Sequence, residues 1–274
     1  MRKKHKSFFL RYKRRIMKEL KEKIKNGWQI SAVGFTGVVK RDYEPQRKSA
    51  WLNTILENAP SKDKLKILDV GTGPGFFANI LSEAGHDVTG IDLSENMIEE
   101  AKKNAKDFGV EPRFICMDIQ HPNLPDNTFD LIVSRNVVWS LSETRETYKN
   151  WLRILKPGGR VIVFDGDHLK DLREPEKYGK SKFDLEKYKE KYIEMYGEEP
   201  KCSYTKDTYE VARGWRVGLP LAKEKRPQWD AENCIDVGFR EIYVNINVND
   251  KVLGDERDRE MSKNSPFFML VATK

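Results

Sequence analysis

The chain has 274 residues, of which 34% are charged and 38% hydrophobic, and its formal net charge is +7. This length suits one large α/β domain with additions, or two small domains. No run of residues is long and apolar enough to span a membrane, and the N-terminus lacks the apolar core of a signal peptide, so we expect a cytoplasmic protein without a membrane partner. The three cysteines and four histidines are scattered without the spacing of metal ligands, which predicts a reducing compartment and no metal site.

The first 25 residues are strongly basic and carry an apolar residue at every fourth position from Phe8 to Ile24. This spacing predicts an amphipathic helix. Its charge allows two interpretations, a surface that binds nucleic acid and an apolar face that packs on the rest of the protein. Because Glu19 and Glu22 interrupt the basic run, we favour the packed face over a nucleic-acid partner.

The next stretch, residues 28–43, contains several aromatic residues and glycines and is unlike a regular helix. Helical spacing returns over residues 46–59. We therefore expect two helices separated by an irregular segment.

A strand, a glycine turn and a helix follow in direct succession. Residues 66–70 are a short, mostly apolar run, 71–75 read Gly-Thr-Gly-Pro-Gly, and a helical pattern begins at Phe76. The glycines permit a sharp turn and leave no side chain between the backbone and a ligand, while the start of the helix attracts anionic groups. A second strand over 87–91 ends on Asp92, where a doubly wound sheet places an acid near the hydroxyls of a nucleotide ribose.

The spacing of the glycines argues against two common nucleotide-binding motifs. The last glycine of a dinucleotide fingerprint falls on Phe76 or on Ala78, and no Gly-Lys-Ser/Thr of a P-loop follows. The chain instead reads Asp-x-Gly-x-Gly-x-Gly from Asp69 to Gly75, which resembles motif I of the class I S-adenosylmethionine (SAM) dependent methyltransferases. A carboxylate at the start of the turn suits the ammonium group of SAM better than a pyrophosphate. Alternatively, Asp69 caps the amides of the turn.

Strand and helix patterns alternate after the glycine turn. We expect further strands over 113–117, 129–134, 160–165, 241–248 and 267–273, and helices over 95–108, 142–155 and 229–237. Strands that alternate with helices of this length imply parallel crossovers, and hence an α/β fold with a doubly wound sheet. The resemblance implies seven strands, the last of them antiparallel, in a Rossmann-like methyltransferase fold.

The resemblance extends over about residues 64–165. Residues 118–119 match the place where this family contacts adenine, 126–132 match the segment that leads into the fourth strand, and 152–159 match the turn before the fifth strand. By pattern, the nearest group contains the ubiquinone and menaquinone methyltransferases, which act on small molecules. That group often has a histidine after the fourth strand, where this chain has Arg135.

The resemblance implies that SAM is the cofactor. The residues that it assigns to the cofactor site are Asp69, Gly71, Thr72, Gly73, Gly75, Asp92, Leu93, Met97, Asp118, Ile119 and Arg135. It implies that Asp69 and the amides of the turn hold the amino-acid group, that Asp92 accepts from the ribose hydroxyls, and that Asp118 and Ile119 flank the adenine. Leu93 and Met97 are expected on the adenine face, although ordinary core positions are equally compatible with their apolar character.

We expect four regions along the chain: an N-terminal helical lid over 1–60, a SAM-binding core over 61–165, an inserted substrate-facing segment over 166–225, and a C-terminal completion of the sheet over 226–274. The insertion is expected to select the substrate because loops past the carboxyl ends of parallel strands line the ligand crevice. Within it, residues 182–195 have the spacing of a helix.

Five residues are candidates for contact with the acceptor. Tyr43 and Arg47 lie in the expected lid, and Trp139 and Trp215 are candidate walls of an apolar or aromatic pocket, although each is equally compatible with ordinary packing. His168, shortly after the fifth strand, is a candidate general base, with a solvated loop residue as the alternative.

These observations predict an enzyme that transfers a methyl group from SAM to a small molecule. A nucleic-acid methyltransferase is an alternative favoured by the basic N-terminus, but the amino-methylating members carry Asn/Asp-Pro-Pro-aromatic after the fourth strand, where residues 134–137 read Ser-Arg-Asn-Val. A SAM-binding module without catalysis is a second alternative, and the glycine spacing disfavours a dehydrogenase. The sequence leaves open the acceptor, its methylated atom, the use of a general base and the oligomeric state.

Overall fold

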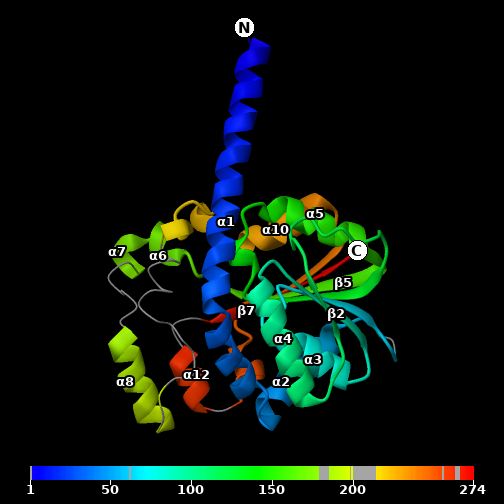
Figure 1. Ribbon diagram of the computed structural model, residues 1–274, viewed down its shortest axis with the longest axis vertical. Helices are drawn as coiled ribbons and strands as arrows, with labels where there is room; N and C mark the ends of the chain where they lie inside the picture. Colours follow the sequence, from blue (N-terminus) through cyan, green and yellow to red (C-terminus); the bar gives the residue numbers. More distant parts are fainter. Residues whose placement is uncertain are drawn as a thin grey trace.

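The computed structural model describes residues 2–61, 63–178, 185–197, 199, 214–254, 256–262 and 266–274. A seven-stranded sheet with the order β3-β2-β1-β4-β5-β7-β6 forms its centre (Figure 1). The strands are β1 (Lys66–Val70), β2 (Asp87–Asp92), β3 (Arg113–Cys116), β4 (Phe129–Arg135), β5 (Leu155–Gly166), β6 (Glu241–Asn245) and β7 (Phe267–Thr273). β1 to β5 pair in parallel, whereas β7 runs antiparallel to both of its neighbours. The predicted α/β fold, with its antiparallel last strand, is confirmed.

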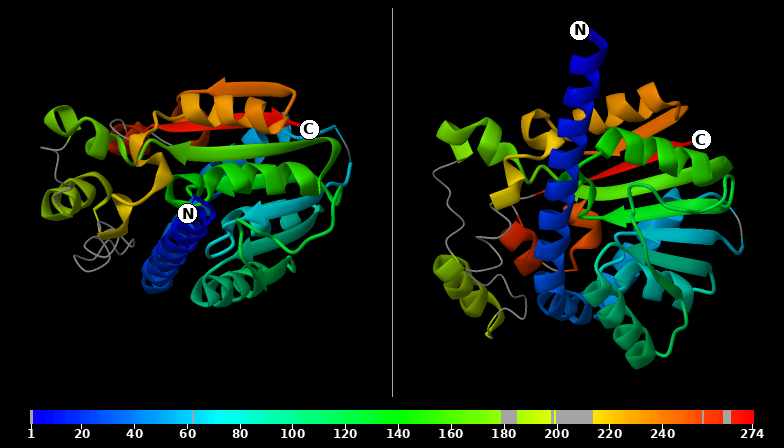
Figure 2. Two further views of the ribbon diagram at one scale, coloured as in Figure 1. Left: turned by 90° about the horizontal axis from the view of Figure 1, so that it is seen from above. Right: turned by 45° about the horizontal axis from the view of Figure 1, so that its top comes forward.

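Helices cover both sides of the sheet (Figure 2). They are α1 (Arg2–Asp42), α2 (Pro45–Asn58), α3 (Phe76–Glu83), α4 (Glu95–Phe108), α5 (Thr144–Ile154), α6 (Lys170–Arg173), α7 (Pro175–Tyr178), α8 (Leu185–Tyr196), α10 (Gln228–Val237), α11 (Asn249–Val252) and α12 (Glu256–Ser262), with short 3-10 helices η1 (Val138–Ser140) and η2 (Pro220–Lys223). In the part of the chain described, no helix combines the length and the apolar character needed to cross a membrane.

The core lies on the two faces of the sheet because neighbouring residues of a strand point to opposite faces. Leu131 and Val133 of β4 pack with α2 and α3, while Ile132 between them packs with α5 and α10. Both faces are therefore covered, and the central strands are apolar on both sides, as buried parallel strands require. This burial fixes the register that brings the carboxyl ends of β1, β2 and β4 together.

Helix α1 differs from the sequence-based expectation. It continues without interruption from Arg2 to Asp42, although residues 28–43 were expected to be irregular. Gly27, Gly34 and Gly37 each disfavour an isolated helix by about 1 kcal/mol, but packing on the domain outweighs this cost. Helix α1 packs against α4, where Lys25 pairs with Glu95 and the Thr36 hydroxyl donates to Glu100, and its first turns project beyond the domain (Figure 1).

The remaining differences concern the ends of elements. β5 begins at Leu155 rather than at residue 160, since Leu155 already pairs with Phe129 of β4 and residues 156–159 form an irregularity before the pairing resumes at Arg160. β6 ends at Asn245, three residues short of the expected end, because the Asn245 side chain accepts a hydrogen bond from the N–H of Asn247 and turns the chain. The described part of the insertion contains α6, α7, α8 and η2, and α8 confirms the expected helix.

Candidate functional site

The glycine turn adopts a conformation that only glycine accommodates easily. Gly71, Gly73 and Gly75 all have positive φ, at 67°, 52° and 89°. A side chain at Gly71 would also overlap the side chain of Val137, which follows β4. The turn after β1 is therefore packed directly against the segment after β4, and substitution of Gly71 is expected to disturb both.

Asp69 stabilises the glycine turn from within. Its Oδ2 atom accepts hydrogen bonds from the Thr72 hydroxyl at 2.6 Å and from the Ala78 N–H at 3.0 Å. Burial raises the pKa of Asp69 to about 6, while these two hydrogen bonds and the charge of Arg135 act in the opposite direction. Asp69 thus caps the turn, as the alternative interpretation expected, and it also lines the cavity described below.

Asp92 joins the ends of the first two strands. Its Oδ2 atom accepts from the Gly73 N–H at 3.0 Å, and its Oδ1 atom accepts from the Ser94 N–H at 2.9 Å. Asp92 is half-buried and faces the cavity, and the removal of bulk water raises its pKa to about 6 despite these hydrogen bonds.

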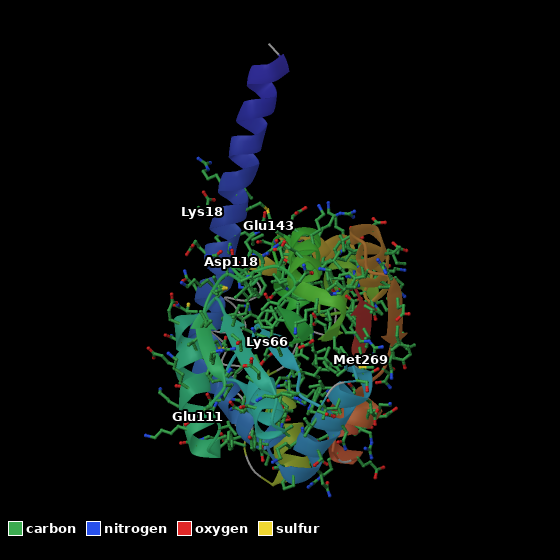
Figure 3. The ribbon with its side chains drawn as sticks, turned by 90° about the vertical axis from the view of Figure 1, so that its right-hand side faces the viewer. Lys18, Lys66, Glu111, Asp118, Glu143 and Met269 are labelled. Atoms are coloured by element: carbon green, nitrogen blue, oxygen red, sulfur yellow. The ribbon has the colours of Figure 1, made fainter. Side chains whose placement is uncertain are left out.

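A cavity of about 250 Å³ lies at the carboxyl ends of the strands, beneath α1. The residues of the expected cofactor site that line it are Asp69, Gly71, Thr72, Gly73, Asp92, Leu93, Met97, Ile119 and Arg135. Two expected residues do not line it. Gly75 lies against Ala101 and Phe114, and the Asp118 carboxylate forms an ion pair with Lys21 of α1. Figure 3 shows Asp118 beside α1.

Helix α1 supplies one wall of this cavity, through residues of the expected helical lid that were not singled out from the sequence. Its lining residues are Lys21, Ile24, Trp28, Phe35, Val38, Arg41 and Asp42. Lys21, Trp28, Phe35 and Asp42 recur at every seventh position, which is a helical spacing that continues through the stretch expected to be irregular. Leu253, within the connection between β6 and β7, and Phe267, the first residue of β7, line the cavity as well and carry no comparable sequence signal.

Arg135 is held between α1 and three aromatic rings. Its Nη1 atom donates to Asp42 Oδ2 at 2.7 Å. The centre of its guanidinium lies 4.8 Å from the Phe76 ring and 5.1 Å from the rings of Trp51 and Phe77, within the range of cation–π attraction. The positive charge of Arg135, at the end of β4, is therefore fixed in place at the cavity wall.

The two lid candidates point in different directions. Arg47 is buried, lines the cavity and pairs with Asp42 and with Asp258 of α12. Tyr43 is not among the lining residues; its hydroxyl donates to Glu83 at 2.9 Å and its ring stacks on another helix, away from the cavity. Arg47 is thus placed for contact with a ligand, and Tyr43 fastens the end of α1 to the outside of the domain.

The two tryptophan candidates pack against Trp28, a residue of the cavity wall. Trp139 and Trp215 stack with ring centroids 5.4 Å apart, and both contact Trp28, which itself lines the cavity. His168 packs on Trp139, and its Nε2 atom is 3.5 Å from the Asp165 carboxylate. None of Trp139, Trp215 and His168 is among the cavity-lining residues in the described part of the chain. Within that part, no three side chains are grouped to hold a metal ion.

Comparison with protein families identifies residues 68–163 as matching a "Methyltransferase domain". Among curated proteins, phosphoethanolamine N-methyltransferase 3 of Arabidopsis thaliana is 38% identical over 101 residues, which cover 36% of this chain and 21% of that protein. A ubiquinone biosynthesis O-methyltransferase of Coxiella burnetii is 32% identical over 96 residues, which cover 35% of this chain and 41% of that protein. The chain thus matches less than half of the length of these relatives.

Solved structures share the fold over more of the chain. A SAM-dependent methyltransferase from Mesorhizobium loti has a TM-score of 0.55 at 19% identity and covers 82% of this chain and 98% of its own. Phosphoethanolamine N-methyltransferase 2 of Haemonchus contortus, in complex with SAM, has a TM-score of 0.53 at 18% identity and covers 81% of this chain and 51% of its own. At these identities the likeness establishes the architecture alone.

Proposed function

This chain carries a methyltransferase domain of the class I SAM-dependent family, as its sequence predicts, and we propose that it transfers a methyl group from SAM to a small-molecule acceptor. The observation that carries the proposal is a single cavity bounded by the glycine turn on one side and by Trp28 and Phe35 of α1 on the other. A donor at the turn and an acceptor under α1 would therefore meet in one enclosed space.

The residues at the turn fit an adenosyl amino acid. Asp92 offers a half-buried carboxylate at the end of β2, where ribose hydroxyls are expected to donate. Leu93, Met97 and Ile119 give that part of the cavity an apolar lining suited to adenine. Asp69 and Arg135 place both signs of charge near the turn, as a zwitterionic amino-acid group requires.

When bound, SAM supplies a methyl group on a positively charged sulfur. The protein's contribution is to hold the acceptor in line with that group and to exclude water, a positioning effect that contributes on the order of 7 to 11 kcal/mol in well-oriented reactions. Ile24, Trp28 and Val38 of α1 form the cover that keeps water out. His168 packs on Trp139 and is not among the residues that line the cavity. To act as a general base, it would have to reach an acceptor in the cavity past those lining residues.

On the acceptor side, we propose that Arg47 and the aromatic residues Trp28, Phe35 and Phe267 contact the substrate. Trp139 and Trp215 then act by supporting Trp28. Residues 1–60 serve as the lid in this proposal. The enclosed position of the cavity beneath α1 favours a small acceptor over a nucleic acid, and we propose a cytoplasmic location.

Calorimetric titration with SAM and with S-adenosylhomocysteine tests the cofactor directly. We expect saturable binding of both ligands to the wild type, strong weakening in Asp92→Ala, and no change in Asp87→Ala. Asp87 lies at the opposite end of β2, where it pairs with Arg113 at the surface, and serves as the matched control. Absence of binding to either ligand would refute the proposal, as would equal losses in the two variants.

Two further measurements separate the alternatives. Methyl transfer from labelled SAM to components of a small-molecule extract distinguishes an enzyme from a module that binds SAM without catalysis. A gel shift with RNA over a series of salt concentrations tests the basic N-terminus, because nucleic-acid binding through lysine and arginine weakens steeply with salt. A specific shift, combined with methylated RNA, would favour the nucleic-acid alternative.

A further inference from the structure

The backbone donors of the glycine turn are all used by the protein itself. Within residues 71–75, two N–H groups donate to the carbonyl oxygen of Ile91, one donates to Asp92 and one to the carbonyl oxygen of Thr72, while Pro74 has no N–H. These bonds hold the turn in shape. A ligand carboxylate that enters here therefore meets no N–H group of the turn that is without an acceptor.

The charges of the turn make a ligand carboxylate still more dependent on a cation. Asp69 and Asp92 both line this end of the cavity, so a third carboxylate would be repelled unless a positive group is present. The guanidinium of Arg135 lines the same cavity and is close enough to Asp69 to favour its ionised form. Arg135 is thus a cation of the cavity wall whose charge acts on Asp69 of the turn.

The guanidinium of Arg135 retains donors for a ligand. Among the described residues, Asp42 is its single hydrogen-bonding partner, through one nitrogen. A guanidinium has five N–H donors in a flat fork that matches a carboxylate. The rings of Trp51, Phe76 and Phe77 fix the group without neutralising its charge.

We propose that Arg135 binds the carboxylate of the amino-acid group of SAM, and that Asp42 of α1 is a positioning residue that orients the Arg135 guanidinium. This inference rests on the proposed function. It ties the last residue of α1 to the bound cofactor, so that closure of α1 and binding of the carboxylate favour each other.

The other cations that line the cavity have different placements. Lys21 is paired with Asp118, which follows β3, and Arg47 lies between Asp42 and Asp258. Arg41 precedes Asp42 on α1, lines the cavity and is half-buried like Arg135, which makes it the matched control for the loss of one positive charge at the cavity.

The test compares two ligands that differ in the carboxylate alone, SAM and decarboxylated SAM, by calorimetry on the full chain. We expect Arg135→Gln to weaken SAM binding by about 10- to 100-fold, the effect of losing a hydrogen-bonded charge pair. The same variant should bind decarboxylated SAM with the affinity of the wild type. Arg41→Gln should leave the ratio of the two affinities unchanged, and Asp42→Asn should reduce the preference for SAM by a smaller factor.

Arg135→Lys is the control for a variant that fails to fold, because it keeps a positive charge beside Asp42 but lacks the flat guanidinium fork. We expect it to retain the wild-type melting temperature more closely than Arg135→Gln and to show an intermediate preference for SAM. Equal loss of both ligands in the Arg135 variants would overturn the inference, and so would a loss of preference in Arg41→Gln alone. A wild type that binds neither ligand would instead refute the proposed function, and this inference with it.

Discussion

The Oδ2 atom of Asp92 lies 3.0 Å from the backbone nitrogen of Gly73, so the acid at the end of β2 holds the turn at the end of β1. Burial raises the pKa of Asp92 to about 6, above its ordinary value of 3.8. The folded state therefore binds more protons than the unfolded chain between about pH 4 and 6, and the free energy of unfolding falls as the pH rises through that window.

This pH dependence should be smaller in Asp92→Asn, which cannot ionise. We expect the wild type to lose about 1 to 3 kcal/mol more than the variant between pH 4 and pH 7 in urea unfolding. Asp69, whose pKa is also raised to about 6, remains in both proteins, and most of its contribution cancels because the charge of Asp92 is the smallest of the influences on it. Parallel pH profiles for the two proteins would contradict the expectation.

SAM affinity should change in the opposite direction with pH. An ionised Asp92 accepts hydrogen bonds from hydroxyl donors better than a protonated one, so binding should weaken as the pH falls below about 6. Titrations at pH 5.0 and 7.5 measure this change, and Asp92→Asn serves as a reference whose affinity should be weaker and nearly independent of pH.

Gly71→Ala and Gly109→Ala form a matched pair. Both glycines have φ close to 70°, so each substitution should destabilise the fold by about 1 kcal/mol through backbone strain. At Gly109 no atom of the described residues lies within 4 Å of the added methyl group, whereas at Gly71 the methyl group overlaps Val137. We expect Gly71→Ala to show the larger loss in urea unfolding and also weaker S-adenosylhomocysteine binding, while Gly109→Ala binds like the wild type.

A buried ionic network behind the cavity should dominate stability. The Arg226 guanidinium donates to Asp165 at 2.9 Å and to Asp230 at 2.8 Å, and Asp165 also accepts from the N–H of Trp139. Arg226→Met would remove the guanidinium that pairs with two buried acids, at a cost of about 3 to 5 kcal/mol. Arg145→Met, which breaks an exposed pair, should cost less than about 1 kcal/mol. Similar urea midpoints for the two variants would show that the network contributes little.

The closure of α1 should depend on ionic strength. Lys25 of α1 pairs with Glu95 of α4 at 2.8 Å, at the surface beside the cavity. We expect Lys25→Gln, or added salt, to increase the dissociation rate of S-adenosylhomocysteine about two- to fivefold, because both weaken the contact between the helices. Stopped-flow tryptophan fluorescence measures this rate, since Trp28 and Trp51 line the cavity. Lys103→Gln is the control, since Lys103 pairs with Glu100 within α4 itself, and its rate should match the wild type.

The parts of the site that follow from sequence are those whose residues lie close together in the chain. The glycine turn over 71–75, Asp69 and Asp92 are set by the ends of two adjacent parallel strands, so a strand pattern and a motif are enough to place them. The course of α1 was predicted incorrectly beyond residue 28. Its glycines oppose a helix locally, and only the packing on α4 reveals why the helix continues.

The incorrect prediction for α1 also explains why Tyr43 and Arg47 were both proposed to contact a ligand. Because α1 was not expected to continue to Asp42, the sequence offered no way to tell which residues near its C-terminal end face the cavity. Tyr43 was therefore grouped with Arg47, although Arg47 lines the cavity and Tyr43 bonds to Glu83 instead. Leu253 and Phe267 were missed for a different reason. They reach the cavity through the connection between β6 and β7, and no local pattern encodes such a long-range approach.

The residues that line the cavity come from two different parts of the chain, and this has an evolutionary consequence. The residues around the glycine turn belong to the stretch 68–163 that matches the methyltransferase domain, whereas α1, Leu253 and Phe267 lie outside it. Relatives can therefore conserve the use of one methyl donor while their acceptors diverge through changes in the flanking segments. Exchange of those segments between two relatives is the route by which acceptor preference would pass from one to the other.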